Sequence, residues 1–219
     1  QRELSEFVGQ EKILSEESLL GVARKSQTLP SLILWGPPGV GKTTLALLLA
    51  REFEAEFVQL SAVGSGIKEL RAVFSSAEER KREGRKTILF VDEVHRWNKS
   101  QQDALLPHVE RGTIILIGAT TENPSFEVNP ALLSRTQVIV LSALSSDHIE
   151  ALLRRAILDE ELGLGKKRVS VEDAAIRMMA ELSGGDARAA LNMLEATTAS
   201  KGAVPTERIR AMLSRPRFA

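Results

Sequence analysis

The sequence predicts an α/β fold, with a parallel five-stranded sheet between helices, followed by a small all-α domain. Short apolar runs alternate with helical segments up to residue 144, which is typical of strands joined by crossover helices. A glycine-rich stretch, 36–43, joins the first central run to a helix. We therefore expect two domains, one at residues 1–144 around the sheet and one at 145–219 built from helices alone.

The composition is that of a globular protein with a core, at 43% apolar and 26% charged residues. The 29 basic residues balance the 29 acidic ones, so the chain is not a globally basic nucleic-acid coat, although a local basic patch stays open. Cysteine is absent, which excludes disulfides and cysteine-ligated zinc.

No apolar stretch approaches the length of a membrane span, and residues 1–4 lack a signal-peptide pattern. We expect a cytoplasmic protein with no membrane partner. In a bacterium it would be associated with the nucleoid, and in a eukaryote it would be nuclear.

A phosphate-binding loop is predicted at 36–43, which follows the apolar run 32–35 and leads into the apolar helix 45–50. Glycines allow a tight turn whose N–H groups point at an anion, and the positive end of the helix dipole faces the same anion. Lys42 is expected to reach the β- and γ-phosphates, and the Thr43 hydroxyl to bind Mg²⁺. The alternative, a glycine turn without a ligand, is disfavoured by the complete spacing.

Residues 87–91 are apolar without alternation, which indicates a strand buried on both faces of a parallel sheet. Asp92 and Glu93 follow at its carboxyl end, where open α/β sheets place their ligands. We expect Asp92 to hold Mg²⁺ directly or through water, and Glu93 to polarise the water that attacks the γ-phosphate. The alternative is a strand that ends in an acidic turn.

The remaining elements of the first domain follow from the same patterns. Strands are predicted at 57–60, 113–118 and 138–141, and helices at 68–85, 100–111 and 129–135. His95 is not expected to bind a metal, because no second histidine or spare carboxylate lies at ligand spacing.

Two polar residues near the strand ends are ambiguous from sequence alone. Thr121 follows the strand at 113–118, and its hydroxyl could contact the γ-phosphate or cap the next turn with comparable weight. Arg135 closes the short helix at 129–135, where an isolated arginine is usually a surface or ion-paired residue.

The predicted helices of the second domain are 147–161, 171–182 with a cap at Ser170, a third that ends near 198, and 205–213. Asp186 is expected to be the N-cap of the third helix. Arg188 lies in that helix's first turn, where a cation opposes the dipole and needs an anion nearby. A phosphate is one candidate, and Asp186 or Glu181 is the other.

This order of elements resembles the AAA+ ATPases, and it is most similar to the family of replication-associated recombination protein A and the Werner-helicase-interacting ATPase. The resemblance extends from Leu4 to about Arg215 and is carried by the strings at 7–10, 34–39, 92–96, 98–103 and 118–127. It implies an AAA+ nucleotide-binding domain followed by a helical lid.

The resemblance also implies ATP or ADP with Mg²⁺ as cofactors and assigns residues to them. Val8 and Gly9 would border the adenine. Thr121 would be a sensor at the end of the fourth strand, and Arg188 a second sensor that contacts the γ-phosphate from the lid. The phosphates would be cradled by Pro37, Pro38, Gly39, Val40, Gly41, Lys42, Thr43 and Thr44.

Partners are implied by resemblance alone. Arg135 would be an arginine finger on ATP held by a neighbouring subunit, which requires a homo-oligomer with shared ATP sites. The family acts on DNA at stalled or damaged replication forks, on junctions of single-stranded and duplex DNA, and a single-stranded-DNA-binding protein is a candidate further partner. Its members continue into a C-terminal oligomerisation domain, so we expect this chain to be the ATPase core of a longer protein.

Several alternatives stay open. The chain could be a clamp-loader-like or Holliday-junction-motor-like AAA+ ATPase, or a protein remodeller, although the loop at 62–66 lacks the aromatic residue such a machine uses. A DExH helicase would need a second motor domain. A nucleotide-gated binding module would not need Glu93. The basic residues 80–86 could contact DNA phosphates, but a solvated helix end explains them more simply.

Overall fold

The computed structural model describes residues 3–161, 163–167 and 169–198, and it divides into two compact units. The first unit contains the chain up to Pro37 and from Gly41 to Ser142. The second contains the chain from Ala143 onward, together with Pro38–Val40 of the glycine-rich stretch. The assignment of these units as a nucleotide-binding domain and a lid stays a prediction.

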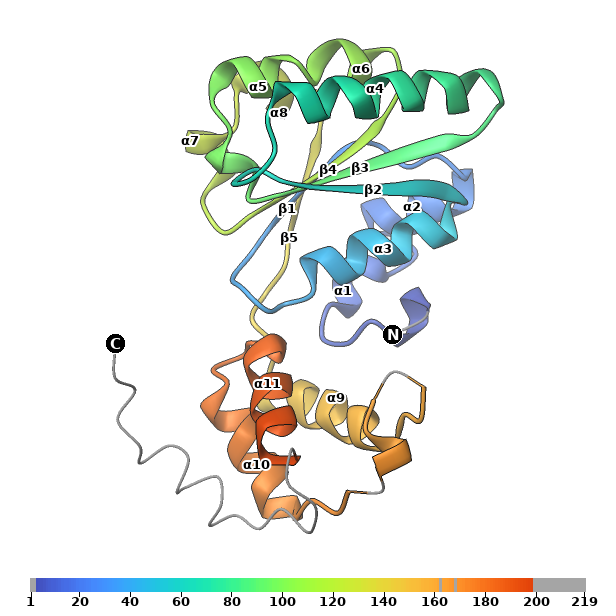
Figure 1. The fold of residues 1–219 in the computed structure, drawn as a ribbon. Helices are drawn as coiled ribbons and strands as arrows, with labels where there is room; N and C mark the ends of the chain where they lie inside the picture. The colour runs from blue at the N-terminus through green and yellow to red at the C-terminus, as the bar shows by residue number, and fades with distance from the viewer. Residues whose placement is uncertain (1–2, 162, 168, 199–219) are drawn as a thin grey trace. The chain divides into compact units, whose positions relative to one another are not determined.

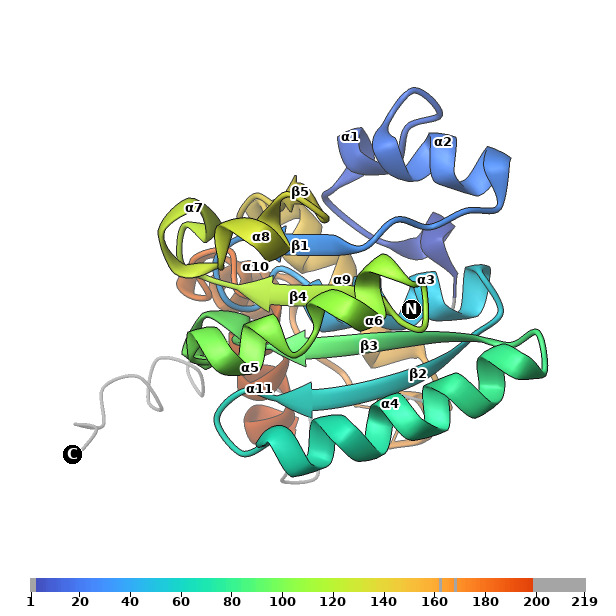
Figure 2. The same ribbon diagram turned by 90° about the horizontal axis from the view of Figure 1, so that it is seen from above.

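A five-stranded parallel sheet forms the first unit, in the order β2-β3-β4-β1-β5 (Figure 2). The predicted parallel sheet is therefore confirmed. The central strands β3, β4 and β1 are the uninterrupted apolar runs, and such runs bury both faces of a strand. The strands are β1 Leu32–Trp35, β2 Ala55–Ser61, β3 Lys86–Asp92, β4 Ile115–Thr120 and β5 Gln137–Val140.

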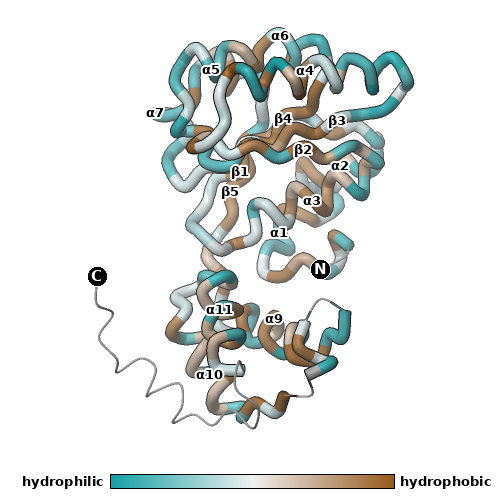
Figure 3. The backbone as a smooth tube through the Cα atoms, viewed as in Figure 1, coloured by the Kyte–Doolittle hydropathy of each residue, from teal (hydrophilic) through white to brown (hydrophobic). Residues whose placement is uncertain are grey.

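Helices cover both faces of this sheet (Figure 1). α3 lies on one face, and α4, α5 and α6 lie on the other. Leu70 and Phe74 of α4 pack with Leu89 and Leu116 of the sheet, and the strands form the most hydrophobic part of the unit in Figure 3. The helices are α1 Glu11–Leu14, α2 Leu19–Ser26, α3 Lys42–Glu52, α4 Ile67–Arg82, α5 Lys99–Asp103, α6 Leu106–Glu110, α7 Pro124–Glu127 and α8 Pro130–Leu133, with 3₁₀ turns at η1 Leu4–Glu6 and η2 Val94–Arg96.

Several predicted elements of this unit have different bounds in the structure. The helix predicted at 68–85 ends at Arg82, the helix predicted at 129–135 spans only Pro130–Leu133, and the strand predicted at 57–60 spans Ala55–Ser61. The single helix expected at 100–111 is wrong, because α5 ends at Asp103 and α6 starts at Leu106. Pro107 lacks the N–H that a continuous helix would need there. The fourth strand begins at Ile115 rather than at Thr113, because the N–H groups of Thr113 and Ile114 donate to the carbonyl of His108 and complete the turn after α6.

The second unit is helical over the residues that the structure describes. Its elements are α9 Ser146–Leu158, η3 Gly165–Lys167, α10 Asp173–Leu182 and α11 Ala187–Thr198. Ile149, Leu153, Met179 and Leu194 form its buried core. Ser145 caps α9 by accepting from the N–H of His148, and α9 ends at Leu158, three residues earlier than predicted.

The expected cap at Ser170 is wrong, because α10 begins at Asp173 and its N-cap position is Glu172. Asp186 does cap α11, as predicted, since its Oδ1 accepts from the N–H of Ala189 at 3.0 Å. The helix predicted at 205–213 lies outside the described residues. Within the described part of the chain, no helix has the length and apolar character needed to cross a membrane.

His108 gives the first unit a testable dependence on pH. Its ring stacks on Phe74 of α4, with centroids 3.7 Å apart, and its Nδ1 is buried without a hydrogen bond. Burial lowers the pKa of His108, and Arg111 lowers it further, while the charge of Glu78 opposes this shift. Because the unfolded chain binds the proton more readily, stability is lost as the pH falls through the unfolded value of about 6.5.

We expect His108→Phe, which keeps the stacked ring but cannot be protonated, to remove this part of the pH dependence. Urea unfolding of both proteins from pH 8 to pH 5 measures the difference. The variant should gain stability relative to the natural protein as the pH falls. Parallel stability curves over this range would show that the folded protein does not disfavour protonation of His108.

Candidate nucleotide site

The glycine-rich stretch connects β1 to α3 in the predicted strand–turn–helix arrangement. Gly39 and Gly41 have φ angles of 72° and 97°, which L-residues with side chains rarely adopt. A Cβ on Gly41 would also lie 2.8 Å from a ring carbon of Phe7. Glycine is thus required at Gly41 both by the backbone conformation and by the packing of the N-terminal segment.

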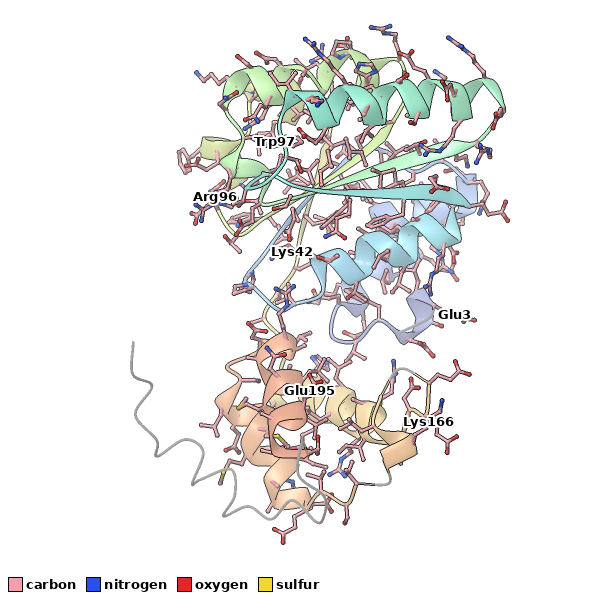
Figure 4. The ribbon with its side chains drawn as sticks, viewed as in Figure 1. Glu3, Lys42, Arg96, Trp97, Lys166 and Glu195 are labelled. Atoms are coloured by element: carbon pink, nitrogen blue, oxygen red, sulfur yellow. The ribbon has the colours of Figure 1, made fainter. Side chains whose placement is uncertain are left out.

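Lys42 begins α3 and turns its side chain back over the stretch that precedes it (Figure 4). Its Nζ donates to the carbonyl oxygens of Gly36 at 2.7 Å and Pro37 at 2.8 Å. The ammonium group therefore lies against the loop backbone, and Thr43, half-buried, follows in the first turn of α3. A positive charge and a helix N-terminus at one loop are suited to an anion.

The register of the central strands brings the predicted polar residues to one edge of the sheet. Val91 pairs with Gly118, and Trp35 pairs with Thr120. The N–H of Gly36 donates to the carbonyl of Thr120 at 3.2 Å, which extends this ladder into the loop. The carboxyl ends of β3, β4 and β1 consequently meet where the loop begins.

Asp92 and Glu93 occupy this edge with different backbone conformations. Asp92 ends β3, and its Oδ1 accepts from the N–H of Glu93 at 3.1 Å. Glu93 has φ 53° and ψ 45°, a left-handed conformation that costs roughly 1–2 kcal/mol for a residue with a side chain. Its carboxylate lies 3.7 Å from Nε of Arg96, with 42% of the Glu93 side chain exposed.

At the end of β4 the structure separates two adjacent threonines. Thr120 is buried, its Oγ1 is 3.0 Å from Nδ1 of His95, and it accepts from the N–H of Glu122 at 3.0 Å. Thr121 is exposed. The turn-capping role that was one alternative for Thr121 is thus performed by Thr120, which the sequence analysis did not single out.

The ring of His95 forms a hydrogen bond with Thr120 Oγ1. Among the described residues, no cluster of three or more histidine, cysteine or acidic side chains could hold a metal by itself. A metal ion at this edge would therefore need ligands besides the protein carboxylates.

Arg135 follows α8 and is held by local contacts. Its Nε pairs with the carboxylate of Glu110, and its Nη1 donates to the Ala131 carbonyl at 2.9 Å and to Ser134 Oγ at 3.0 Å. Its side chain is 40% exposed. The ion pair is what sequence alone suggested for an isolated arginine, and a role towards a neighbouring subunit stays a prediction.

Within the second unit, the N-terminus of α11 contacts Gly39. The N–H of Ala187 donates to the Gly39 carbonyl at 3.1 Å, and a Cβ on Gly39 would lie 1.8 Å from Oδ1 of Asp186. Arg188 is the next residue of the helix and is exposed. Its two candidate anions, a phosphate and a nearby carboxylate, both remain predictions.

The segment before α1 contributes residues whose contacts were not predicted. Phe7 is buried, Gly9 has φ 80°, and the N–H of Gly9 donates to Glu11 Oε1 at 3.0 Å. Trp97 is a second residue whose contact was not predicted. It is buried after η2, and its Nε1 donates to the Ser65 carbonyl at 3.1 Å, so it connects the segment after β3 to the loop after β2. An aromatic residue inside a polar stretch was the only sequence signal for this connection.

Comparison with known proteins identifies the family of this arrangement. The model of the ATPase family associated with various cellular activities (AAA) matches residues 32–144, more than half of the chain. The chain belongs to the AAA family.

Relatives of this AAA chain include two groups that the sequence resemblance had named. It is 53% identical over 192 residues to replication-associated recombination protein A of Haemophilus influenzae, which is 88% of this chain and 43% of that protein. It is 49% identical over 193 residues to the ATPase WRNIP1 of Dictyostelium discoideum, which is 88% of this chain and 22% of that protein. The resemblance predicted from sequence is confirmed, and the chain spans less than half the length of these relatives.

Solved structures show the same AAA fold. The Thermotoga maritima RuvB Holliday junction branch migration motor is similar with a TM-score of 0.77 and 28% sequence identity. The similarity covers 97% of this chain and 71% of that one. The two proteins therefore share the sheet between helices that the sequence predicted.

The two threonines at the end of β4 should respond differently to the same substitution. We expect Thr120→Val to destabilise the fold by about 1–3 kcal/mol, because it leaves the ring of His95 and the N–H of Glu122 without their partner. Thr121→Val, at an exposed position, should change stability by less than about 0.5 kcal/mol. Chemical denaturation of both variants measures the difference, and equal losses would contradict the capping role of Thr120.

Proposed function

We propose that this AAA chain binds ATP with Mg²⁺ and hydrolyses it, as the ATPase core of an oligomer that acts on DNA at stalled or damaged replication forks. The observation that carries the proposal is the single sheet edge where the loop at Gly36, the carboxylates of Asp92 and Glu93, and the end of β4 meet. Phosphoryl transfer uses a cationic group to hold the phosphates, carboxylates to bind Mg²⁺ and orient water, and a hydroxyl to bind the metal. Side chains of these kinds lie at or next to this edge.

The loop suits a triphosphate because Gly39 and Gly41 adopt positive φ angles of 72° and 97°, which allow the tight turn that a phosphate loop needs. N–H groups of a glycine-rich turn form anion-binding concavities, and the N-terminus of α3 adds its dipole. We assign the phosphate cradle to residues 37–44, with the Lys42 ammonium moving from the carbonyls of Gly36 and Pro37 to phosphate oxygens. Exchange of carbonyl acceptors for anionic oxygens strengthens these hydrogen bonds.

Two oxygen-bearing side chains fit a magnesium ion at the same edge. Mg²⁺ prefers hard oxygen ligands and usually keeps several waters, so one or two protein groups beside the phosphates suffice. We assign the Thr43 hydroxyl and the Asp92 carboxylate to this role. When bound, the ion neutralises charge on the phosphate oxygens.

Glu93 is assigned to the attacking water. Glu93 follows the end of β3 in a left-handed backbone conformation, and 42% of its side chain is exposed. A carboxylate there can accept a proton from water as the water attacks, and positioned general bases contribute about 10²–10⁴ in rate. Thr121, exposed at the neighbouring strand end, would orient the same water or the γ-phosphate.

The remaining assignments rest on the relatives. Val8 and Gly9 would border the adenine, Arg188 would contact the γ-phosphate, and Arg135 would act on ATP in a neighbouring subunit. Relatives named for replication-associated recombination support action on DNA. The finer proposals follow the family resemblance: the substrate would be forks and junctions of single-stranded and duplex DNA, with a single-stranded-DNA-binding protein as a partner.

A second candidate is a motor on four-way DNA junctions. It is favoured by the similarity to the RuvB Holliday junction branch migration motor over nearly the whole chain. A protein remodeller is less well supported, because the exposed side chain in the loop after β2 is Val63 rather than an aromatic residue.

The hydrolysis assignment is tested with Glu93→Gln in the full-length protein. We expect steady-state phosphate release from Mg-ATP to fall by about 10²–10⁴, because the general base is lost, while a fluorescent ATP analogue binds with little change. Glu122→Gln is the matched control, because it makes the same carboxylate-to-amide change at an exposed residue of the same sheet edge; this variant should hydrolyse ATP at the natural rate.

Forked duplex DNA should raise ATP turnover in the natural protein and in the control variant. Turnover that ignores forks but rises with four-way junctions would favour the second candidate.

The shared-site assignment of Arg135 is tested by mixing inactive subunits. Arg135→Ala should lower turnover in the assembled protein by about 10³–10⁵, the range of arginine fingers in related phosphoryl transfer. Mixed with Glu93→Gln subunits, it should recover activity, because some interfaces then combine an intact Glu93 with an intact Arg135 from the neighbour. Arg85→Ala, which removes another exposed arginine, serves as the control. Absence of recovery in verified mixed oligomers would contradict action across subunits.

A further inference from the structure

Gln10 is a buried amide that clamps a distant peptide. The residue is only 5% exposed, and its Nε2 donates to the carbonyl of Ser142 at 2.7 Å. The N–H of Ser142 donates back to Gln10 Oε1 at 3.2 Å. Both polar ends of the amide thus bind the two polar groups of one residue, as a neighbouring strand would.

Ser142 is the last residue of the first unit, and the helical unit begins at Ala143. The clamp therefore holds the peptide from which the second unit departs. Leu141 precedes it and is bound to the sheet, since its N–H donates to the Trp35 carbonyl at 2.7 Å. β5 itself ends at Val140, so Gln10 continues the pairing two residues beyond the strand.

We call Leu141 and Ser142 the exit peptide, because the second unit begins directly after them. The exit peptide also touches the phosphate loop. A Cβ on Gly36 would lie 2.4 Å from the carbonyl oxygen of Leu141, so the loop's first glycine packs directly on the residue before Ser142. At the other end of the loop, Gly41 packs on the ring of Phe7. The segment at 7–10 thus makes two contacts. Phe7 packs on the phosphate loop, and Gln10 binds the exit peptide, which itself packs on the loop.

We propose that Gln10 is a positioning residue that couples occupancy of the nucleotide site to the exit peptide at Ser142. Val8 and Gly9, which the proposed function places beside the adenine of ATP, lie in sequence between Phe7 and Gln10, whose side chains are anchored. A ligand that orders this segment also orders the Ser142 peptide, and a fixed exit peptide favours the ligand in return, because coupling between two sites is reciprocal. The inference rests on the proposed binding of ATP.

The Ser142 amide proton is a direct probe of this coupling. Hydrogen exchange of the Ser142 N–H, followed by NMR in the natural protein with and without Mg-ADP, should slow when the nucleotide binds. Gln10→Ala should speed this exchange in both conditions, abolish its response to nucleotide, and weaken Mg-ADP binding by about 5- to 150-fold, the usual range for coupled sites.

Gln102 provides a matched control, since it is also a buried clamping amide in the first unit. Its Nε2 donates to the carbonyls of Trp97 at 3.0 Å and Glu127 at 3.2 Å, and its Oε1 accepts from the N–H of Asn129 at 2.7 Å. Gln102→Ala removes three side-chain hydrogen bonds and Gln10→Ala removes two, so Gln102→Ala should lower the unfolding temperature at least as much. It should keep both the Mg-ADP affinity and the nucleotide response of Ser142.

Gln10→Glu separates coupling from simple loss of packing. As a carboxylate it offers only acceptors, one of which faces the Ser142 carbonyl, whereas the protonated acid has an O–H donor for that carbonyl and an acceptor for the Ser142 N–H. Burial against a carbonyl oxygen favours the protonated form and should raise the pKa of this carboxyl. The Mg-ADP affinity of this variant relative to the natural protein should therefore recover as the pH is lowered from 8 to 5.5. A packing defect alone would show no such recovery.

The outcomes distinguish the inference from the function beneath it. If the natural protein binds no Mg-ADP, the proposed function and this inference both fail. If it binds Mg-ADP but exchange at Ser142 is unchanged, or Gln10→Ala weakens binding no more than Gln102→Ala, only the coupling through Gln10 fails. Slowed exchange that depends on Gln10, with recovery of the Gln10→Glu variant at low pH, supports it.

Discussion

The parallel register of β3, β4 and β1 is the constraint on which the rest of the structure depends. Hydrogen bonding fixes Val91 beside Gly118 and Trp35 beside Thr120, so three separate chain segments must end at one edge. A register slip of one residue in any of these strands would turn its buried side chains to the opposite face and displace its terminal polar group. Core packing and site geometry are therefore enforced by the same set of backbone bonds.

Much of this arrangement could be predicted because its signals are local. Strands buried on both faces need unbroken apolar runs, and a loop that approaches phosphate closely needs glycine, so both leave a clear pattern in the sequence. The position of Asp92 after β3 and the cap at Asp186 followed in the same way. These features depend on residues within a few positions of one another.

The errors and omissions arose where a distant or backbone contact decides the outcome. The carbonyl of His108 takes the N–H groups that the expected start of β4 would have used, and no side-chain pattern reveals that competition. The burial of Thr120 rather than Thr121 depends on the ring of His95, a residue from the end of another strand. Gln10 and Ser142 are separated by 132 positions, and their pairing requires the folded sheet to bring them together.

The left-handed backbone of Glu93 opposes fold stability to the role that we propose for its carboxylate. Glycine is the residue that adopts this conformation without strain, yet glycine has no carboxylate to accept a proton. Under the role that we propose for Glu93, selection for thermal stability alone would therefore favour replacing the carboxylate and would yield folded chains that do not hydrolyse ATP.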